Sequence, residues 1–324
     1  MQNAGRNQGK TTGGLKISAP YQQQTTYRGR FAPSPTGPLH AGSLIAALAS
    51  YLDARANRGL WFLRIEDLDP PRESPAALKQ ILQALEELNL LWDGEIIYQS
   101  QRSQAYQEAL ARLQEQALIF PCTCSRQDIQ DHGGIYPGFC RERELNEVNA
   151  ESDTFSLRCK VPDIAIQFDD LLQGKQSQNL RSDVGDFILK RKDGLFAYQL
   201  AVVVDDAFQE ITHVVRGIDL IDSTPRQIYL QRLLGYKQPV YAHIPVIINS
   251  QGQKLSKQHH ANPLPAGKPS LSLYQALICL HQQPDADLKN AAPADIITWA
   301  IEHWNIDRLS ELKHLDEDQF YITY

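Results

Sequence analysis

The chain has 324 residues, which is long enough for a catalytic domain with an insertion and a substantial hydrophobic core. Its formal net charge of −6 gives no electrostatic case for non-specific binding to nucleic acid, so any contact with RNA must use local basic patches. The five cysteines are unevenly spaced, which argues against a disulfide framework and fits a reducing cytoplasm, and no run approaches the roughly 18 apolar residues of a membrane helix.

Residues 1–26 form a polar N-terminal segment that is rich in Gln, Gly and Thr. The segment shows neither a helical nor an alternating period, so we expect a disordered tail. It also lacks the apolar central region of a secretory signal, which excludes that class of segment.

The segment from Gly29 to Ser43 predicts a short strand, a tight turn rich in proline, and the start of a helix. Apolar residues then recur at helical spacing as far as about Asn57: Leu44, Ile45, Leu48 and Leu52. The helix begins near His40 and Gly42, where its N–H groups and its dipole suit an anion such as phosphate. The alternative is an ordinary strand-to-helix turn with an incidental histidine.

Residues 60–65 predict a buried strand, and three acids follow its carboxyl end: Glu66, Asp67 and Asp69. Ligands of open α/β sheets bind beyond the carboxyl ends of the strands, and a carboxylate in that place can receive a substrate ammonium. We expect Asp67 and Asp69 only to cap or solvate a loop.

Two amphipathic helices are predicted next. Ser74 and Pro75 supply the cap and the first residue of one helix. Its apolar face consists of Leu78, Ile81, Leu82, Leu85 and Leu88. Residues 101–116 predict the other helix, which turns Tyr106, Leu110 and Leu113 inward.

Three cysteines, Cys122, Cys124 and Cys140, are spaced closely enough to close on one zinc ion. Three thiolates leave a tetrahedral ion one ligand short, so a fourth must come from nearby. His132 is the ordinary chemical choice, whereas the phenol of Tyr136 must lose its proton to bind well. A site with no open position is structural, and the alternative is three free thiols in a loop.

A β-hairpin is predicted for residues 187–191 and 195–198, around the turn Asp193-Gly194, and it returns the chain to the first domain. Short strands at 155–159 and 164–168 precede it and complete an inserted subdomain. The basic residues 190–192 are either a phosphate-contact patch or a solvated hairpin end.

Arg216 ends a predicted strand at residues 211–215. With Arg30, its guanidinium could hold a dicarboxylic amino acid through forked hydrogen bonds, and Glu66 supplies the charge opposite to an ammonium. Tyr198 either donates a hydrogen bond to such a substrate or packs in the core.

Lys254 and Lys257 follow a turn at residues 249–252 and could hold a polyphosphate as pyrophosphate leaves, although a solvated basic loop is the alternative. A capped helix is predicted from Ser223-Thr224-Pro225, and helices at 270–280 and 294–303 follow a proline-rich linker.

These stretches jointly resemble class I aminoacyl-tRNA synthetases. His40-Ala41-Gly42-Ser43 is similar to the first signature sequence of that class, and residues 254–258 are similar to the second. The segments that resemble the glutamyl branch are RFAPSPTG at 30–37, LRIEDLD at 63–69, VVDD at 203–206 and ITHVVRG at 211–217.

The resemblance implies an α/β fold: a Rossmann-like nucleotide-binding domain with an inserted zinc-binding subdomain and a small helical C-terminal region. The expected divisions are a tail at 1–26, the first half of the catalytic domain at 27–98, the insertion at 99–184, the second half with the lysine signature at 185–262, and the helical region at 263–324.

The resemblance also implies the residues of the site. The glutamate-binding residues are Arg30, Phe31, Ala32, Pro33, Ser34, Glu66, Tyr198 and Arg216. The ATP-binding residues are His40, Gly42, Ser43 and Lys257, and the catalytic residues are His40, Lys254 and Lys257. Mg²⁺ would accompany ATP, and a structural Zn²⁺ would be held by Cys122, Cys124, Tyr136 and Cys140.

Several departures resemble the truncated paralogues that modify tRNA(Asp). Residues 217–220 are Gly-Ile-Asp-Leu where glutamyl-tRNA synthetases commonly carry Gly-Glu-Asp-His, the second signature ends in Gln258, and we expect no large anticodon-binding domain. These paralogues activate glutamate with ATP without tRNA and transfer it to queuosine in the anticodon loop. The resemblance implies a cytoplasmic monomer with no obligate protein partner and no membrane contact. The alternatives are a minimal glutamyl-tRNA synthetase that charges a tRNA 3′ end, and a non-catalytic binding protein on a synthetase scaffold.

Overall fold

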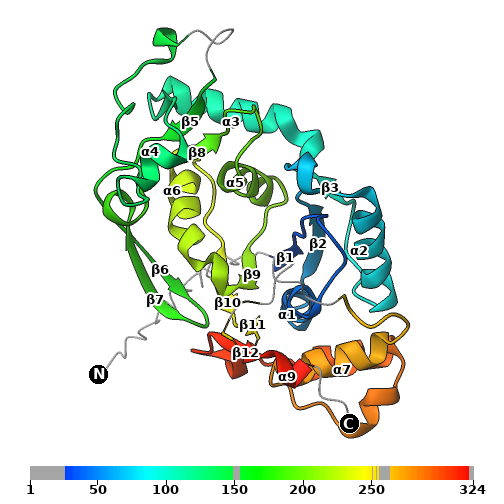
Figure 1. The fold of residues 1–324 in the computed structure, drawn as a ribbon. Coiled ribbons are helices and arrows are strands. Elements are labelled where there is room, and N and C mark those ends of the chain that lie inside the picture. Colours follow the sequence, from blue (N-terminus) through cyan, green and yellow to red (C-terminus); the bar gives the residue numbers. More distant parts are fainter. Residues whose placement is uncertain (1–25, 149–153, 250, 253, 255–262, 321–324) are drawn as a thin grey trace, which may run out of the picture.

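The protein is described by a computed structural model over residues 26–148, 154–249, 251–252, 254 and 263–320 (Figure 1). The expected disordered tail lies outside the described residues except for Thr26, and Lys257 of the second signature also lies outside them. None of the helices in the described part is long and apolar enough to cross a membrane.

A parallel sheet organises the nucleotide-binding half of the molecule. Its strands are β1 (Arg28–Phe31), β2 (Leu60–Ile65), β3 (Ile97–Tyr98), β9 (His213–Gly217) and β10 (Val240–Ile244). β1, β2 and β3 pair in parallel, as do β9 and β10. The Thr212 N–H donates to the Arg28 carbonyl at 3.0 Å, so β1 lies beside β9. The resulting order is β3-β2-β1-β9-β10. The order of the strands along the chain reverses between β1 and β9, and sheets of this kind bind ligands at such a point.

Helices follow these strands as the apolar spacing predicts. They are α1 (Ala41–Ala56), α2 (Pro75–Glu87), α5 (Tyr198–Phe208) and α6 (Thr224–Leu234). The predicted limits of α1 and α2 are confirmed to within about one residue. The predicted capping bonds are wrong, because the Ser74 and Ser223 side chains accept no N–H of α2 or α6. Each helix instead begins with a proline in its first turn, which has no N–H to cap.

A hairpin extends the sheet on the β10 side. β6 (Ala165–Asp170) and β7 (Gly174–Asn179) are antiparallel, and the sheet order is β7-β6-β10-β9. The strand near residues 164–168 is confirmed, but its position in the fold is not one that local sequence predicts. β6 runs parallel to β10, with Asp170 opposite Tyr241, so it reaches the sheet that carries Arg216.

A separate antiparallel sheet lies at the top of Figure 1. It contains β4 (Ile119–Cys122), β5 (Ser156–Cys159) and β8 (Phe187–Lys190), and α3 (Ser103–Glu115) and α4 (Arg126–Gln130) belong to the same region. β8 follows the expected boundary at residue 184 and pairs with β5, which precedes it.

The predicted hairpin after β8 is confirmed, with a shorter second arm than expected. The Asp193-Gly194 turn is present, with Gly194 at φ +86°. Lys190 and Phe196 form an antiparallel bridge across it. The Arg191 N–H donates to the Leu195 carbonyl at 2.8 Å, and the Ala197 N–H donates to the Leu189 carbonyl at 2.9 Å. Tyr198, which was expected in the second arm, begins α5 instead.

The C-terminal region packs against α1. It contains α7 (Pro269–Cys279), α8 (Pro293–His303), β12 (His314–Asp316) and α9 (Glu317–Phe320). The two predicted helices are confirmed. The sequence analysis missed β12, which pairs in parallel with β11 (Val246–Ile248) and ties the end of the chain to the segment after β10.

Candidate active site

A cavity of about 620 Å³ opens at the carboxyl ends of β1 and β9, a volume typical of small-molecule sites. The structure brings into its lining every predicted glutamate-binding, ATP-binding and catalytic residue that it describes. These residues are Arg30, Phe31, Ala32, Pro33, Ser34, His40, Gly42, Ser43, Glu66, Tyr198, Arg216 and Lys254. Residues far apart in the sequence meet here because the parallel strands all end at this edge of the sheet.

At one end of the cavity, four side chains of alternating charge lie in a row. Arg30 Nε is 3.3 Å from Asp206, Arg64 Nη1 is 2.7 Å from the same carboxylate, and Arg64 Nη2 is 3.6 Å from Glu66. Burial opposes the ionisation of Asp206, but the positive charges of Arg64 and Arg30 outweigh it and lower its pKa. Asp206 therefore remains a carboxylate and contacts both arginines.

Glu66 is affected differently by its surroundings. Burial raises its pKa to about 7, although Arg64 and Arg30 oppose the shift. This carboxyl group therefore titrates near neutral pH, and an arriving ammonium would favour its ionised form.

At the other end of the cavity, Arg216 is surrounded by neutral groups. Its guanidinium donates to Gln227 at 2.8 Å, to Thr224 at 2.8 Å, to His243 Nε2 at 3.1 Å and to the Tyr198 hydroxyl at 3.5 Å. Within the described part of the chain, no carboxylate lies within ion-pair distance of Arg216. Its positive charge is therefore not compensated by a direct contact.

His243 connects Arg216 to a buried acid. Its Nδ1 lies 2.5 Å from Asp170 Oδ2. Burial lowers the pKa of His243, although the Asp170 carboxylate opposes this shift. We therefore treat the imidazole as neutral.

The start of α1 also lines the cavity. His40 occupies the N-cap position, and its Nδ1 accepts the Ser43 N–H at 3.2 Å. Lys254 forms an ion pair with Asp219, which also lines the cavity. A helix N-terminus and a lysine thus face the same space, an arrangement that suits phosphate groups.

Comparison with known proteins agrees with this geometry. The model of the family described as "tRNA synthetases class I (E and Q), catalytic domain" matches residues 26–264. The chain belongs to this family. It is therefore a ligase, related to glutamyl-tRNA synthetase.

Similar proteins of this family cover nearly the whole chain. A protein named glutamyl-Q tRNA(Asp) synthetase from Ectopseudomonas mendocina is 52% identical over 295 residues, which are 91% of this chain and 99% of that protein. The protein of the same name from Thiobacillus denitrificans is 53% identical over 287 residues, 87% of this chain and 94% of its own.

A solved structure agrees with the fold. The crystal structure of a glutamate tRNA ligase from Elizabethkingia meningosepticum matches with a TM-score of 0.75 at 24% identity, over 91% of this chain and 68% of that one. The class I synthetase fold, mixed α/β with parallel sheets, is thus shown for this chain.

The sequence analysis missed the buried partners of the synthetase site. The family resemblance includes Asp206 but gives it no role. Its neighbour Asp205 binds Arg102 at 2.5 Å and the Tyr106 hydroxyl at 2.6 Å, and these contacts join α5 to α3. The signal was present in the sequence. Two acids directly after the apolar run 202–204 are expected to be buried, and buried charges need partners.

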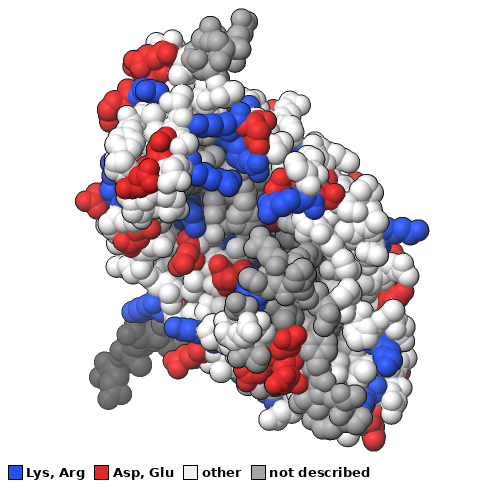
Figure 2. Space-filling model, in the orientation of Figure 1, with Lys and Arg blue, Asp and Glu red and all other residues white. Residues whose placement is uncertain are grey.

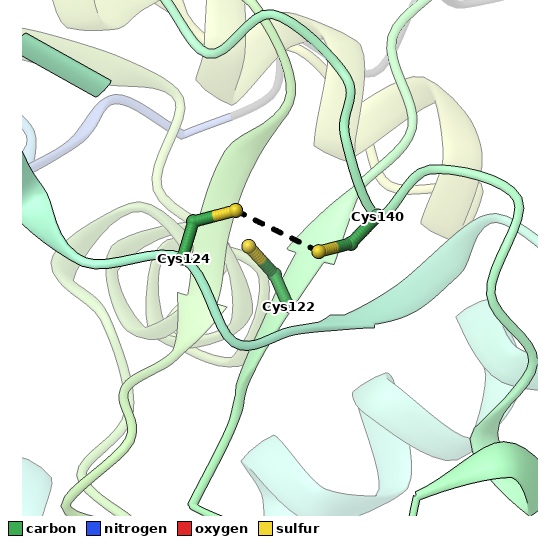
Figure 3. A group of neighbouring side chains, drawn as sticks. All are labelled: Cys122, Cys124 and Cys140. Carbon is green, nitrogen blue, oxygen red and sulfur yellow. Dashed lines mark hydrogen bonds between the residues drawn. The ribbon is translucent and has the colours of Figure 1, made fainter. Parts of the chain in front are cut away.

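The cysteine cluster lies apart from the cavity, beside β4 (Figure 3). The sulfurs of Cys122, Cys124 and Cys140 lie within 4.8 Å of one another, and those of Cys124 and Cys140 are 3.6 Å apart. Sulfurs around one tetrahedral zinc ion, at a Zn–S distance of about 2.3 Å, lie about 3.8 Å apart. The cluster could therefore hold a metal ion.

Of the two candidates for a fourth ligand, Tyr136 contacts the cluster. The Tyr136 hydroxyl accepts the Cys140 N–H at 2.7 Å, and burial among the thiols raises the pKa of this phenol. His132 is exposed, and its Nδ1 pairs with the Asp128 carbonyl at 2.9 Å. Tyr136 is thus already directed at the cluster, whereas the Nδ1 of His132 is occupied.

The charges on the surface are mixed. Figure 2 shows acidic and basic side chains interspersed over one face, with a group of basic ones in its upper half, over the region of α3, β5 and β8. Lys192 donates to the Thr123 carbonyl and Arg143 to the Thr123 hydroxyl, so two cations meet over the cysteine loop. This is a local basic group on a chain of net negative charge.

Proposed function

We propose that the chain activates L-glutamate with ATP as glutamyl-adenylate, without tRNA, and transfers the glutamyl group to queuosine in the anticodon loop of tRNA(Asp). The observation that carries the first step is the cavity that holds Arg30, Glu66 and Arg216 beside the start of α1. The support for the second step is the name shared by relatives about half identical over nearly their full length. We expect a cytoplasmic monomer.

The charges of the cavity match those of glutamate. The substrate has two carboxylates and one ammonium, and we assign the carboxylates to Arg30 and Arg216 and the ammonium to Glu66. Tyr198, whose hydroxyl already contacts Arg216, would donate a hydrogen bond to the substrate. The backbone of residues 31–34 closes the cavity beside Arg30.

Adenylate formation needs no protein nucleophile. A carboxylate oxygen of glutamate attacks the α-phosphorus in line, the bond to the pyrophosphate oxygen breaks, and positioning with charge stabilisation lowers the barrier. We assign the phosphates to His40, Gly42, Ser43 and the α1 N-terminus, and the leaving pyrophosphate to Lys254 and Lys257. Bound Mg²⁺ would neutralise charge on the phosphate oxygens.

We assign the cysteine cluster to one structural Zn²⁺, held by Cys122, Cys124, Cys140 and the phenolate of Tyr136. Burial opposes ionisation of Cys140, but hydrogen bonds from the Thr123 N–H and Tyr136 outweigh it and lower the pKa of this thiol to about 7. One ligand is thus close to its binding form. Metal analysis of the purified chain should find one zinc per chain, and Cys124→Ser should lower that content.

The test of the function locates the product. The chain is supplied with ATP, Mg²⁺, labelled glutamate and queuosine-containing tRNA(Asp), the RNA is digested with nuclease, and the labelled nucleoside is identified. Label on queuosine is the expected result. Label on the terminal adenosine would mean a minimal glutamyl-tRNA synthetase, and absence of glutamate-dependent pyrophosphate exchange would mean a non-catalytic binding protein.

A further inference from the structure

We propose that Asp170 and His243 are positioning residues for glutamate binding, because they fix the imidazole tautomer that holds Arg216. The inference rests on the proposed function in one respect: it takes Arg216 as a ligand of the substrate glutamate. Neither Asp170 nor His243 lines the cavity.

The three side chains come from three adjacent strands. Arg216 on β9 stands directly opposite His243 on β10, and Asp170 is the last residue of β6, which pairs with β10 on its other side. The exposed fractions of Asp170, His243 and Arg216 are 4%, 0% and 5%. Because these side chains are almost fully buried, water cannot readily replace a hydrogen bond that a substitution removes from the row.

The hydrogen bonds allow one tautomer. Arg216 Nε carries a hydrogen and has no lone pair to offer, so His243 Nε2, at 3.1 Å, must be the acceptor. The proton of the neutral ring then sits on Nδ1, which faces Asp170 Oδ2 at 2.5 Å. The carboxylate can only accept, so it selects this tautomer.

The carboxylate is itself fixed. Its other oxygen, Oδ1, accepts the backbone N–H groups of Leu172, Gln173 and His243 at 3.0–3.1 Å. Oδ2 is thus directed at the imidazole, and the Asp170 side chain cannot rotate without breaking three hydrogen bonds at once.

The guanidinium plane depends on this support. Gln227 holds Nη1 and Thr224 holds Nη2, while His243 holds the Nε edge. Three acceptors around a planar fork leave it one orientation. In this orientation the remaining donors point to the Tyr198 hydroxyl at 3.5 Å and the Leu220 carbonyl at 3.4 Å, and both of these residues line the cavity. Loss of the acceptor at Nε removes one of the three hydrogen bonds that fix the guanidinium.

The first test is Asp170→Asn. In this variant the three backbone N–H groups still need an acceptor, so the amide oxygen of Asn takes the position of Oδ1. The amide NH₂ then faces His243 Nδ1, which must accept, and the ring proton moves to Nε2. As a result, the Nε2–H group of His243 faces the Nε–H group of Arg216, and neither can accept. We expect the glutamate KM in pyrophosphate exchange to rise about 10-fold or more, the loss of one hydrogen bond to a charged group, with the ATP KM unchanged and kcat less affected.

A second variant, His243→Gln, distinguishes control of the His243 tautomer from general structural support. In His243→Gln, the side-chain carbonyl can accept from Arg216 whatever residue 170 is, so adding Asp170→Asn should not raise the glutamate KM further. An equal rise in both backgrounds would overturn the inference. His243→Gln should also show a lower glutamate KM than His243→Asn, which cannot place an acceptor at the Nε2 position, and equal values would overturn it as well.

Asp53→Asn is the matched control. Asp53 is a buried acid near the end of α1 that pairs with Tyr27 and with Trp304, away from the cavity. The change should lower stability and leave the glutamate KM unaltered. If the wild-type chain shows no glutamate-dependent exchange, the proposed function fails and the inference fails with it. If the wild-type chain is active and Asp170→Asn keeps its glutamate KM, the inference alone fails.

Discussion

The two ends of the cavity hold their arginines by different means. Arg30 lies against a buried carboxylate, Asp206, which it shares with Arg64. Arg216 lies among neutral acceptors, and the nearest acid of its network, Asp170, acts through an intervening histidine. Arg30 is in direct contact with a carboxylate before any substrate arrives, and Arg216 is not.

Because of this difference, we expect the two arginines to contribute differently to glutamate binding. A charge in direct contact with a buried carboxylate adds less net attraction for a second anion than a charge that has no such contact. Arg216 should therefore supply most of the attraction for a glutamate carboxylate. The Arg30 end should mainly supply the geometry and the contact with the ammonium.

Removing the compensating charge should have the largest effect. Asp206→Asn leaves Arg30 buried without a contacting carboxylate and Arg64 with Glu66 alone, which should lower the free energy of unfolding by about 3–5 kcal/mol. Urea denaturation measures this loss. Gln231→Leu, a change at a buried residue whose contact is with Tyr241, serves as a control and should cost less. A loss below that of the control would show that Asp206 does not compensate this end.

Truncating the two arginines compares the ends directly. Arg216→Ala should weaken glutamate binding by about 2–3 kcal/mol, or about 30-fold to 150-fold in glutamate KM, because it removes an uncompensated charge. Arg30→Ala should raise the same KM less and should leave Asp206 paired with Arg64. Pyrophosphate exchange against glutamate concentration gives both values, and the opposite order would contradict the comparison.

The titration of Glu66 should appear in the pH dependence. Its folded-state pKa of about 7 lies above the ordinary value for a glutamate, so the free site gains a proton as the pH falls through 7. Only the carboxylate accepts an ammonium, so the glutamate KM should rise about tenfold from pH 8 to pH 6. Glu66→Gln should raise the KM at pH 8 and remove this slope. A wild-type KM that stays flat from pH 6 to pH 8 would contradict the assignment.

The smallest expected effect lies outside the cavity. Tyr136→Phe removes the proposed fourth zinc ligand and should lower the zinc affinity, measured by competition with a chelator, by about 10-fold or more, the cost of roughly one hydrogen-bonded ligand. It should change the glutamate KM by less than about twofold, since neither arginine is touched. A larger change in that KM would show that the two regions are coupled.

Local features could be predicted from the sequence, but contacts between residues far apart in the sequence could not. The spacing of Leu44 and Leu48 predicts α1, and the cysteines that meet in Figure 3 lie within one short stretch. By contrast, Arg64 and Asp206 are 142 residues apart, and nothing local in either segment says that they meet. The same holds for Asp170 and His243, whose contact depends on β6 pairing with β10.

The wrong local predictions concern helix caps. Ser74 and Ser223 are of a residue type that often caps helices, but neither side chain accepts a backbone N–H of its helix. The Ser223 hydroxyl instead accepts hydrogen bonds from the side chains of Gln199 at 3.0 Å and Arg226 at 3.4 Å. At Ser223, contacts with side chains thus take the place of the local cap that the residue type favours.

The ion pair between Lys254 and Asp219 also affects which anions the empty cavity admits. Asp219 is already paired with the Lys254 ammonium, so replacing it with a small monovalent anion yields almost no net binding free energy. Such a partly exposed pair contributes less than about 1 kcal/mol, and a triphosphate that also reaches the α1 N-terminus can open it easily. We therefore expect chloride to compete only weakly with nucleotide for this part of the cavity.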